Sequence, residues 1–396
     1  PFYTAGTLFY DLLAGRLGIE RSSSIGRDNA LTRVPPLRQE GLRGGVIYYD
    51  GQFDDARLAI TLARTAASYG AELHSYTPVR GLIKEGGKIA GVETDKGAYR
   101  ARVVINASGI FSDDVRTLDA QGAPKQMQLS RGTHLVFPKH FFPGDTAVII
   151  PKTRDGRVVF FVPWHGRLLV GTTDVAADAP SLEPTPTESE VDFLLESLRD
   201  FLTPSPTRDD ILSQFAGLRP LVSKSPTGNT KKLARTHVIT HSHSGLITIA
   251  GGKWTTYRRM AEEGVDAAVA SAGLHKAACR TRDMPLIGAD SSLDPLDHWS
   301  RYGSEASVVK ALGITPLSPN LPYTEGEVIW AARSEYATSL EDVLARRTRA
   351  LLEDARTSLE IAPRTCHLLA QELGHDTAWE RAQLESYRSL ASNYLP

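Results

Sequence analysis

The sequence predicts a mixed α/β fold in which strands and helices interleave over residues 1–285, followed by a helical domain over residues 286–396. Short β-branched runs alternate with segments of helical periodicity in the first part, whereas after about residue 290 the pattern is helical and rich in Ala, Leu, Glu and Arg. A proline- and glycine-containing stretch near 273–292 is interpreted as a linker. This alternation excludes a helical bundle and a repeat solenoid.

Composition is that of an ordinary globular protein. The 396 residues are 41% hydrophobic and 23% charged with a formal net charge of -1, so no nucleic-acid partner is expected. The only cysteines, Cys279 and Cys366, suit neither a disulfide scaffold nor a zinc site, which indicates a reducing compartment. No apolar run approaches the roughly 20 residues that a membrane-spanning helix needs.

The first third of the chain is expected to contain a few helices and many short strands. Phe2–Leu17 has an apolar face at helical spacing, and so has Asp54–Tyr69, where Gly70 is placed to end the helix. Ala101–Ile105 is nearly all small or β-branched, which predicts a buried strand, and a helix is expected from Ser112. The predicted strands are Val46–Tyr49, Ala71–Tyr76, Val79–Lys84, Ile89–Thr94 and Tyr99–Asn106, with glycine-containing turns between the last three.

A second β-rich block covers about residues 126–175 and is followed by a capped helix. Thr187–Leu202 is amphipathic and opens with Thr-Glu-Ser-Glu, the pattern of a capping box. Thr236–Ala250 returns to strand character. The other strands predicted in this region are Leu135–Phe137, Val148–Ile150, Val158–Val162, Leu168–Gly171 and Gln214–Val222.

The most informative segment is residues 245–259, where a short apolar strand ends in Gly251-Gly252 and is followed by Lys253 and a helical pattern. Glycines let a backbone approach a ligand closely because they lack a Cβ and tolerate positive φ. The first turn of a helix offers unpaired N–H groups and the positive end of its dipole, and Lys253 adds a full charge. The junction suits an anionic or electron-rich ligand, and a plain helix start is the alternative.

Other segments carry residue types suited to a binding site. Arg219 stands at a strand end and Arg235 precedes the next strand; both are candidate anion contacts, with surface ion pairs as the alternative. His134 is a candidate base, or else a structural histidine. Asn106-Ala107-Ser108-Gly109 and Thr172-Thr173-Asp174 each follow a strand and offer either a cofactor-lining surface or a tight turn. The remaining histidines, including His237, His241 and His243, are interpreted as solvated or structural, so no metal site is predicted.

In this order, the segments resemble the FAD-dependent glycerol-3-phosphate dehydrogenases, nearest to the mitochondrial-type branch and its bacterial relatives. The similarity covers nearly the whole chain. The motifs that carry it are Tyr48-Tyr49-Asp50-Gly51-Gln52 with Asp54-Asp55-Ala56-Arg57, Val104–Gly109, Gly132–Val136, Asp155–Trp164, Gly171–Asp174, Gly217–Val222 and Gly245–Arg258, with Ala345–Arg349 in the helical part.

The resemblance implies a reaction and roles for these residues. Such proteins oxidise sn-glycerol 3-phosphate to dihydroxyacetone phosphate and pass the electrons through FAD to membrane quinone. On this analogy Arg219 and Arg235 hold the phosphate, and Thr255 approaches both flavin and substrate. Either His134 or Lys253 would be the catalytic base. The residues expected to contact the cofactor FAD are Asn106, Ala107, Ser108, Gly109, Thr172, Thr173, Asp174, Gly251, Gly252, Lys253, Thr255 and Thr256.

The resemblance also implies a setting and shows one departure. Peripheral association is expected with the cytoplasmic face of a bacterial inner membrane or with the mitochondrial inner membrane, and a homodimer is compatible with it. Phe141-Phe142-Pro143 is either an insertion point or a buried loop. The family opens with a strand–Gly-x-Gly-x-x-Gly–helix unit that this sequence lacks, since Pro1 aligns inside the family pattern. We therefore expect a truncated chain that binds FAD weakly or not at all and is inactive.

Two other functions fit the same residues. The electrons could pass to oxygen, which would make the protein a glycerol-3-phosphate oxidase, and the sequence does not distinguish the two acceptors. Flavin amine oxidases share the fold, but two arginines suit a phosphate better than a lone carboxylate. From a different class, the chain could be a non-catalytic interaction module derived from the fold.

Overall fold

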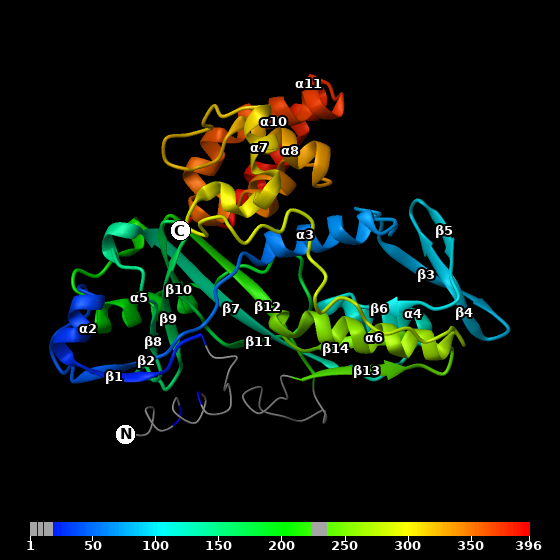
Figure 1. Ribbon diagram of the computed structural model, residues 1–396, viewed down its shortest axis with the longest axis horizontal. Helices are drawn as coiled ribbons and strands as arrows, with labels where there is room; N and C mark the ends of the chain where they lie inside the picture. Colours follow the sequence, from blue (N-terminus) through cyan, green and yellow to red (C-terminus); the bar gives the residue numbers. More distant parts are fainter. Residues whose placement is uncertain (1–5, 7–10, 12–18, 223–235) are drawn as a thin grey trace.

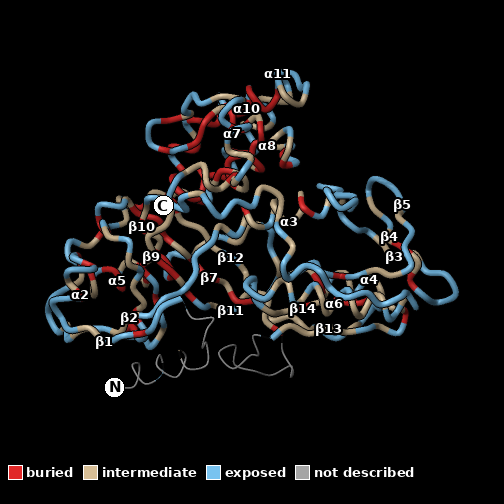
Figure 2. Tube along the Cα trace, in the orientation of Figure 1, coloured by how far each residue is buried: buried red, intermediate tan, exposed pale blue. Residues whose placement is uncertain are grey.

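The computed structural model describes residues 6, 11, 19–222 and 236–396. Arg235 and nearly all of the helix expected over Phe2–Leu17 lie outside the described residues. A long antiparallel sheet occupies the middle of the molecule, a small sheet flanked by α4 and α6 lies at one end, and the helical domain is stacked over both (Figure 1). Buried residues concentrate in the helical domain and in the central sheet with α5 (Figure 2).

The central sheet is built around β7 (Met127–Pro138), which has neighbours on both edges. β10 (Arg167–Gly171) and β11 (Val175–Ala177) pair in succession with one edge of β7, and β12 (Ser213–Val222) pairs with the other edge. The turn at residues 172–174 therefore lies beside the middle of β7. β9 (Val159–Trp164) and β8 (Val148–Ile150) complete the sheet.

Helix α5 (Glu188–Phe201) covers this sheet, and its predicted capping box is confirmed between Thr187 and Glu190. Its residues Leu194 and Leu198 are fully buried with Leu135 and Phe137 of β7 in one hydrophobic core. Phe141 and Phe142 belong to the same core, with Phe142 only 1% exposed. In the fold, the Phe141-Phe142-Pro143 segment is thus a buried loop, and its phenylalanines are not available for membrane insertion.

The sheet at the far end joins segments that are distant in the sequence. β14 (Ile247–Gly251) pairs antiparallel with β13 (His237–His241) and parallel with β6 (Ile105–Asn106), flanked by α4 (Ser112–Asp119) and α6 (Tyr257–Ser271). The strand predicted over Tyr99–Asn106 is wrong in part because it is interrupted after Arg100, and the burial predicted for Ala101–Ile105 is wrong at Ile105, which is 38% exposed. Among the described strands, β14 alone pairs with β6, so the outer edge of β6 is uncovered.

A three-stranded meander, β3 (Val79–Glu85), β4 (Lys88–Thr94) and β5 (Gly97–Arg100), confirms three of the predicted strand positions and their turns. The strand predicted at Ala71–Tyr76 is wrong. Tyr76 has φ 51°, which an extended ladder does not allow, and its hydroxyl donates to Asp342 at 2.8 Å. A contact with the helical domain thus replaces strand pairing there.

The helical domain lies on α3 (Asp55–Ser68), a helix that the sequence pattern predicted. Its N-cap Asp54 accepts from two backbone N–H groups of the first turn. Gly70, with φ 90°, follows the end of the helix. The domain's elements are η7 (His298–Glu305), α7 (Ala306–Leu312), α8 (Glu325–Ser334), η8 (Asp342–Arg347), α9 (Ala350–Glu353), α10 (Ala355–Leu373) and α11 (Thr377–Ser392). Shorter elements elsewhere are β1 (Ser23–Gly26), α2 (Arg27–Arg33), β2 (Gly44–Ile47), η2 (Gly109–Phe111), η3 (Lys139–Phe141), η4 (Arg208–Asp210) and η6 (Trp254–Thr256).

Candidate functional site

Three adjacent strands place His134. It stands in the middle of β7, opposite Gly171 of β10 on one side and opposite Phe215 of β12 on the other. A Cβ added to Gly171 would overlap the imidazole Cδ2, so glycine is what lets the ring lie over the β10 backbone. On the other side the imidazole stacks on the Phe215 ring, with centroids 5.3 Å apart and planes 16° apart.

Arg219 lies on β12 opposite Ser130 of β7, and its guanidinium crosses the backbone of Gly132. Nη2 donates to Thr172 Oγ1 at 2.7 Å, and Nη1 donates to the Thr173 carbonyl oxygen at 3.1 Å. A Cβ on Gly132 would overlap Nη2. Two glycines, Gly132 and Gly171, therefore make room for the two charged or titratable side chains of this sheet.

The turn between β10 and β11 uses its own side chains to hold this arrangement. Thr173 is buried, donates to Glu190 Oε1 at 2.6 Å and accepts from the Thr133 backbone N–H at 2.9 Å. Asp174 accepts from the Ser130 hydroxyl. The side chains of Thr173 and Asp174, expected along FAD, are thus engaged within the protein, and the segment's direct contribution is the fixed position of Arg219.

Glu190 connects the turn to helix α5. It receives hydrogen bonds from Thr173 and from the backbone and hydroxyl of Thr187, and it pairs with Arg131 Nε at 2.9 Å. Burial raises the pKa of the Glu190 carboxyl, but these hydrogen bonds and Arg131 outweigh burial and leave the pKa below its usual value. The Glu190 carboxylate therefore compensates the charge of Arg131.

His134 is neutral at physiological pH. Burial and, to a smaller extent, the positive charge of Arg219 together lower its pKa to about 4, although a hydrogen bond to the Gly132 backbone opposes them. Its Nδ1 is buried and has no hydrogen-bond partner among the described residues. A neutral imidazole with an unpaired nitrogen beside a fixed guanidinium suits a polar, anionic ligand.

Asn106-Ala107-Ser108-Gly109 forms the turn after β6. Asn106 is 3% exposed; its Nδ2 donates to the Ser112 carbonyl oxygen at 2.9 Å and to Thr248 Oγ1 at 3.3 Å. Its Oδ1 accepts from the Ser108 hydroxyl at 2.6 Å. The Asn106 side chain thus holds the turn itself, leaving the backbone of Ala107–Gly109 as the surface that could face a cofactor.

At the turn after β14 the two glycines lie close to neighbouring protein side chains, and their predicted approach to a ligand stays a prediction. Gly251 and Gly252 have φ of 74° and 81°, and a Cβ on them would lie 2.7 Å from Val222 Cγ2 and 2.5 Å from Met260 Sδ. Lys253 precedes the short helix η6, where Thr256 Oγ1 donates to the Lys253 carbonyl oxygen at 3.0 Å. Lys253, Thr255 and Thr256 are exposed.

The two groups of predicted residues meet at β12. Val222 at the end of this strand packs against Gly251, and η2, after the Asn106 turn, contacts both β12 and β14. His134, Arg219 and Thr172–Asp174 form one group on the central sheet, while Asn106–Gly109 and Gly251–Thr256 form the other. Arg235, the remaining predicted phosphate contact, lies outside the described residues.

Sequence reasoning missed several residues that build the site. Phe215 carries no motif, and its role depends on strand register. Gly132 and Gly171 lie inside two of the family motifs, but the motifs do not show which side chains these glycines accommodate. Strand pairing with β7 brings Arg219 to Gly132 and His134 to Gly171. Glu190 was recognised as a helix cap, and its hydrogen bond to Thr173 gave no sequence signal.

Neither a metal centre nor a membrane span is found in the described parts of the chain. No group of three or more His, Cys, Asp or Glu side chains there could hold a metal ion. None of the helices described combines the length and hydropathy that crossing a bilayer requires.

The fold and the site together define an α/β flavin-type oxidoreductase with an added helical domain. The parallel strands β6 and β14 each end in a glycine-containing turn, and a helix begins after the β14 turn, which fits a flat, electron-rich cofactor approached by backbone. The profile described as FAD dependent oxidoreductase matches residues 5–258, and the chain belongs to this family. The profile described as C-terminal domain of alpha-glycerophosphate oxidase matches residues 279–380.

Within this family, the chain is similar to proteins named as glycerol-3-phosphate dehydrogenases. The chain is 38% identical to a probable mitochondrial glycerol-3-phosphate dehydrogenase of Caenorhabditis elegans, over 98% of this chain and 59% of the relative. It is 34% identical to a mitochondrial glycerol-3-phosphate dehydrogenase of Arabidopsis thaliana, over 99% of this chain and 70% of the relative. The solved glycerol-3-phosphate dehydrogenase of Bacillus halodurans, complexed with FAD, superposes with a TM-score of 0.81 at 26% identity, covering 94% of this chain and 80% of that chain. The chain thus spans about three fifths of the length of the animal relative.

Proposed function

We propose that this protein catalyses the FAD-dependent oxidation of sn-glycerol 3-phosphate to dihydroxyacetone phosphate and passes the electrons to membrane quinone. The observation that carries the proposal is the fixed Arg219 guanidinium beside a neutral, half-buried His134 on the neighbouring strand. The relatives, which are named as glycerol-3-phosphate dehydrogenases, support the same assignment.

In this proposal Arg219 binds the substrate phosphate. Its hydrogen bonds to Thr172 and Thr173 fix the guanidinium before substrate arrives, so little side-chain entropy is lost on binding. Arg235 is proposed as the second phosphate contact from its place in the sequence. The positively charged Lys253, exposed at the start of η6, adds favourable potential for a dianionic ligand.

His134 is the proposed proton acceptor for the substrate hydroxyl. Its low pKa leaves the imidazole neutral across the physiological range, so a nitrogen lone pair is present to accept the proton. Bound FAD would supply the acceptor for the hydride that leaves C2. Lys253 stays the alternative base, and a His134→Gln variant that retains full turnover would favour it.

The test uses the purified chain supplied with FAD and measures dihydroxyacetone phosphate. On this proposal we expect product from glycerol 3-phosphate and none from glycerol, an outcome that would refute the expectation, made from the sequence, that the chain is inactive. Arg219→Lys should raise the KM at least about tenfold because a single ammonium replaces a two-pronged donor. Arg154→Lys, which changes an arginine whose side chain is 85% exposed, is the matched control. Absence of product from the wild-type chain would contradict the proposed activity.

The electron acceptor is proposed by analogy with the mitochondrial relatives. Peripheral membrane association and a homodimer belong to the same proposal. A quinone analogue should sustain turnover without hydrogen peroxide, and the protein should sediment with anionic lipid vesicles. The match of residues 279–380 to a glycerophosphate oxidase domain supports oxygen as the rival acceptor. Stoichiometric peroxide would establish that alternative.

A further inference from the structure

Phe215 has two environments at once. One side of its ring stacks on His134 across the β7–β12 pair. Its other contacts are with Trp164, at the end of β9, and with the hydrophobic core of the helical domain. That core includes the fully buried Tyr323 and Leu351. The residue therefore links the proposed proton acceptor to the helical domain.

The backbone on the N-terminal side of Phe215 is also fixed by the helical domain. Leu212 and Gln214 flank Ser213, and all three exchange hydrogen bonds with that domain. These bonds run from Gln214 N to Tyr394 O (2.9 Å), Gln214 Nε2 to Leu395 O (2.7 Å), Ser213 Oγ to Leu351 O (3.0 Å) and Ala355 N to Leu212 O (3.0 Å). Phe215 cannot shift along or away from β7 without breaking some of them.

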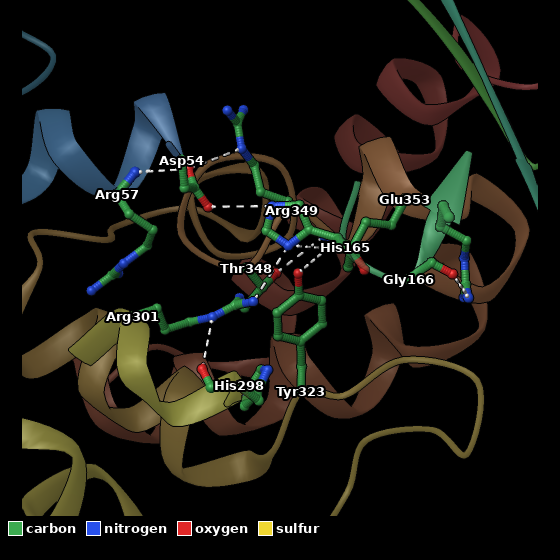
Figure 3. A network of polar contacts seen from close by, with 12 residues as sticks. Asp54, Arg57, His165, Gly166, His298, Arg301, Tyr323, Thr348, Arg349 and Glu353 are labelled. Carbon is green, nitrogen blue, oxygen red and sulfur yellow. Dashed lines mark hydrogen bonds and ion pairs between the residues drawn. The ribbon is translucent and has the colours of Figure 1, made fainter. Parts of the chain in front are cut away.

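The strand on the opposite side of His134 is tied to the same domain. His165, at the tip of the β9–β10 hairpin, points into a cluster of charged side chains where α3 meets the helical domain (Figure 3). Its Nδ1 lies 3.3 Å from Glu353 Oε1 and 3.4 Å from Arg301 Nη2. Gly171 belongs to β10, the second strand of this hairpin. Both residues that flank the His134 imidazole, Gly171 and Phe215, are therefore on strands that the helical domain contacts.

Packing restrains the His134 ring together with its hydrogen bond to the Gly132 backbone. Nδ1 has no hydrogen-bond partner among the described residues, so no bond to that atom fixes the ring rotation. Gly171 presents only backbone to the ring. The stacked Phe215 ring is thus the side chain that restricts the imidazole from the β12 side.

We propose that Phe215 is a positioning residue for His134 and that the helical domain, by holding Phe215, fixes the orientation of the imidazole. The inference deepens the proposed function and depends on it for the role of His134 as proton acceptor. The geometry around His134 does not depend on the proposed function. The helical domain thereby contributes to the site without placing a residue in it.

The test compares Phe215→Leu with Phe215→Tyr, and with Phe201→Leu as the matched control, because Phe201 packs on the other core. The first readout is the NMR signal of the His134 imidazole through a pH titration, assigned with His134→Gln. In Phe215→Leu we expect water to reach the ring, its pKa to rise from about 4 toward the ordinary value of 6.5, and its signal to broaden or split. Phe215→Tyr and Phe201→Leu should leave the signal as in the wild type.

The second readout is turnover of the FAD-supplied protein with glycerol 3-phosphate. Phe215→Leu should lower kcat by roughly tenfold to a hundredfold while KM changes less than about twofold, because Arg219 keeps its own partners. Phe215→Tyr should restore kcat. Should Phe215→Leu not fold, Phe215→Met, which keeps the side-chain volume without the flat ring, replaces it.

A His134 signal in folded Phe215→Leu that matches the wild type in shift and titration would overturn the positioning role, whatever happens to turnover. A fall in kcat that Phe215→Tyr does not restore would overturn it as well. A wild-type chain that forms no product removes the proposed function, and the NMR comparison still decides the orientation of His134.

Discussion

At the scale of single residues, the site depends on where glycine stands beside a large side chain. Gly171 accommodates the His134 ring and Gly132 accommodates the Arg219 guanidinium, and both are in β-strands rather than in turns. Glycine weakens a strand interior, so its presence at these two positions marks sites where another group approaches the backbone. Gly217 on β12 differs, since nothing lies within 4 Å of a Cβ added there.

These three glycines give a matched set of alanine variants. Gly171→Ala should displace His134 and lower kcat at least about tenfold, whereas Gly132→Ala should displace Arg219 and raise KM by a similar factor. Gly217→Ala should leave both constants within about twofold. Steady-state kinetics of the FAD-supplied protein checks this. Equal effects of all three alanines would show that general strand destabilisation, and not local overlap, is responsible.

Glu353 is the residue whose protonation should govern stability near neutral pH. It is fully buried, accepts from Tyr323 Oη at 2.5 Å and faces His165, Arg301, Arg167 and Asp54 (Figure 3). Burial raises its pKa to about 7, and Tyr323, Arg301 and Arg167 only partly oppose this. The pKa of this carboxyl is about 7 in the folded protein and 4.5 in the unfolded chain, so between these pH values the folded protein binds more protons. Stability from this group therefore falls as pH rises through that window.

Glu353→Gln should remove this pH dependence while keeping an oxygen for the Tyr323 hydroxyl. Relative to the wild type, the variant should gain stability on the order of 2–3 kcal/mol between pH 4.5 and pH 7.5. Urea unfolding at several pH values measures the difference. His165, whose pKa burial lowers to about 4, acts in the opposite direction below pH 6.5. A difference that does not change with pH would contradict the assignment.

At the scale of elements, helix α3 attaches the helical domain through two arginines on one face. Arg57 forms a bidentate pair with Glu335 at 2.7 Å for both bonds, and Arg64 forms one with Glu305 at the same distances. Each guanidinium also lies over an aromatic ring of the helical domain, Tyr302 for Arg57 and Trp330 for Arg64. The two positions are seven residues apart, which is two helical turns, so one face of α3 makes both contacts.

Arg57→Met should cost about 3–5 kcal/mol of unfolding free energy, because the change leaves the buried Glu335 carboxylate without its charge partner. Arg333→Met is the matched control: Arg333 forms a bidentate pair with Glu372, but its side chain is 56% exposed, so the cost should stay below about 1 kcal/mol. Denaturant unfolding of the two variants and the wild type makes the comparison. Equal losses of unfolding free energy in the two variants would mean that burial does not strengthen the contribution of the Arg57–Glu335 pair to stability.

At the scale of the whole molecule, the helical domain and the central sheet share contacts of several kinds. Three groups of polar contacts join the helical domain to the rest of the protein. They are the ion pairs of the α3 arginines, the charged cluster around His165, and the hydrogen bonds between β12 and the ends of α9 and α11. Trp164 and Phe215 of the sheet are packed against the helical core. The boundary is therefore continuous with the interior of the helical domain, which Figure 1 shows stacked on the central sheet.

We expect the sheet and the helical domain to unfold together. Thermal unfolding followed by far-UV circular dichroism, which reports mainly helix, and by hydrophobic-dye binding, which reports exposed core, should give coincident transitions. Arg57→Met should lower both midpoints equally. Two separated transitions, with only the helical signal affected by Arg57→Met, would show that the domains are energetically independent.

The sequence by itself determined the local features of this protein. Periodicity and capping residues predicted helices α3 and α5, glycine turns predicted the meander, and ordered motifs supplied the candidate site residues. These signals are local because hydrogen bonds of caps and turns join residues only a few positions apart. The strand expected at Ala71–Tyr76 failed because a distant partner, Asp342, decides the backbone there.

Only the tertiary structure decided which side chains meet. Register across β7 places Phe215 and Gly171 on either side of His134, and Arg57 finds Glu335 at a separation of 278 residues. If β12 were shifted by one residue along β7, Phe215 would point to the opposite face of the sheet. No local sequence pattern records the register of strands that lie so far apart in the sequence. Packing of the sheet against the helical domain supplies that information, because only one register buries both apolar faces together.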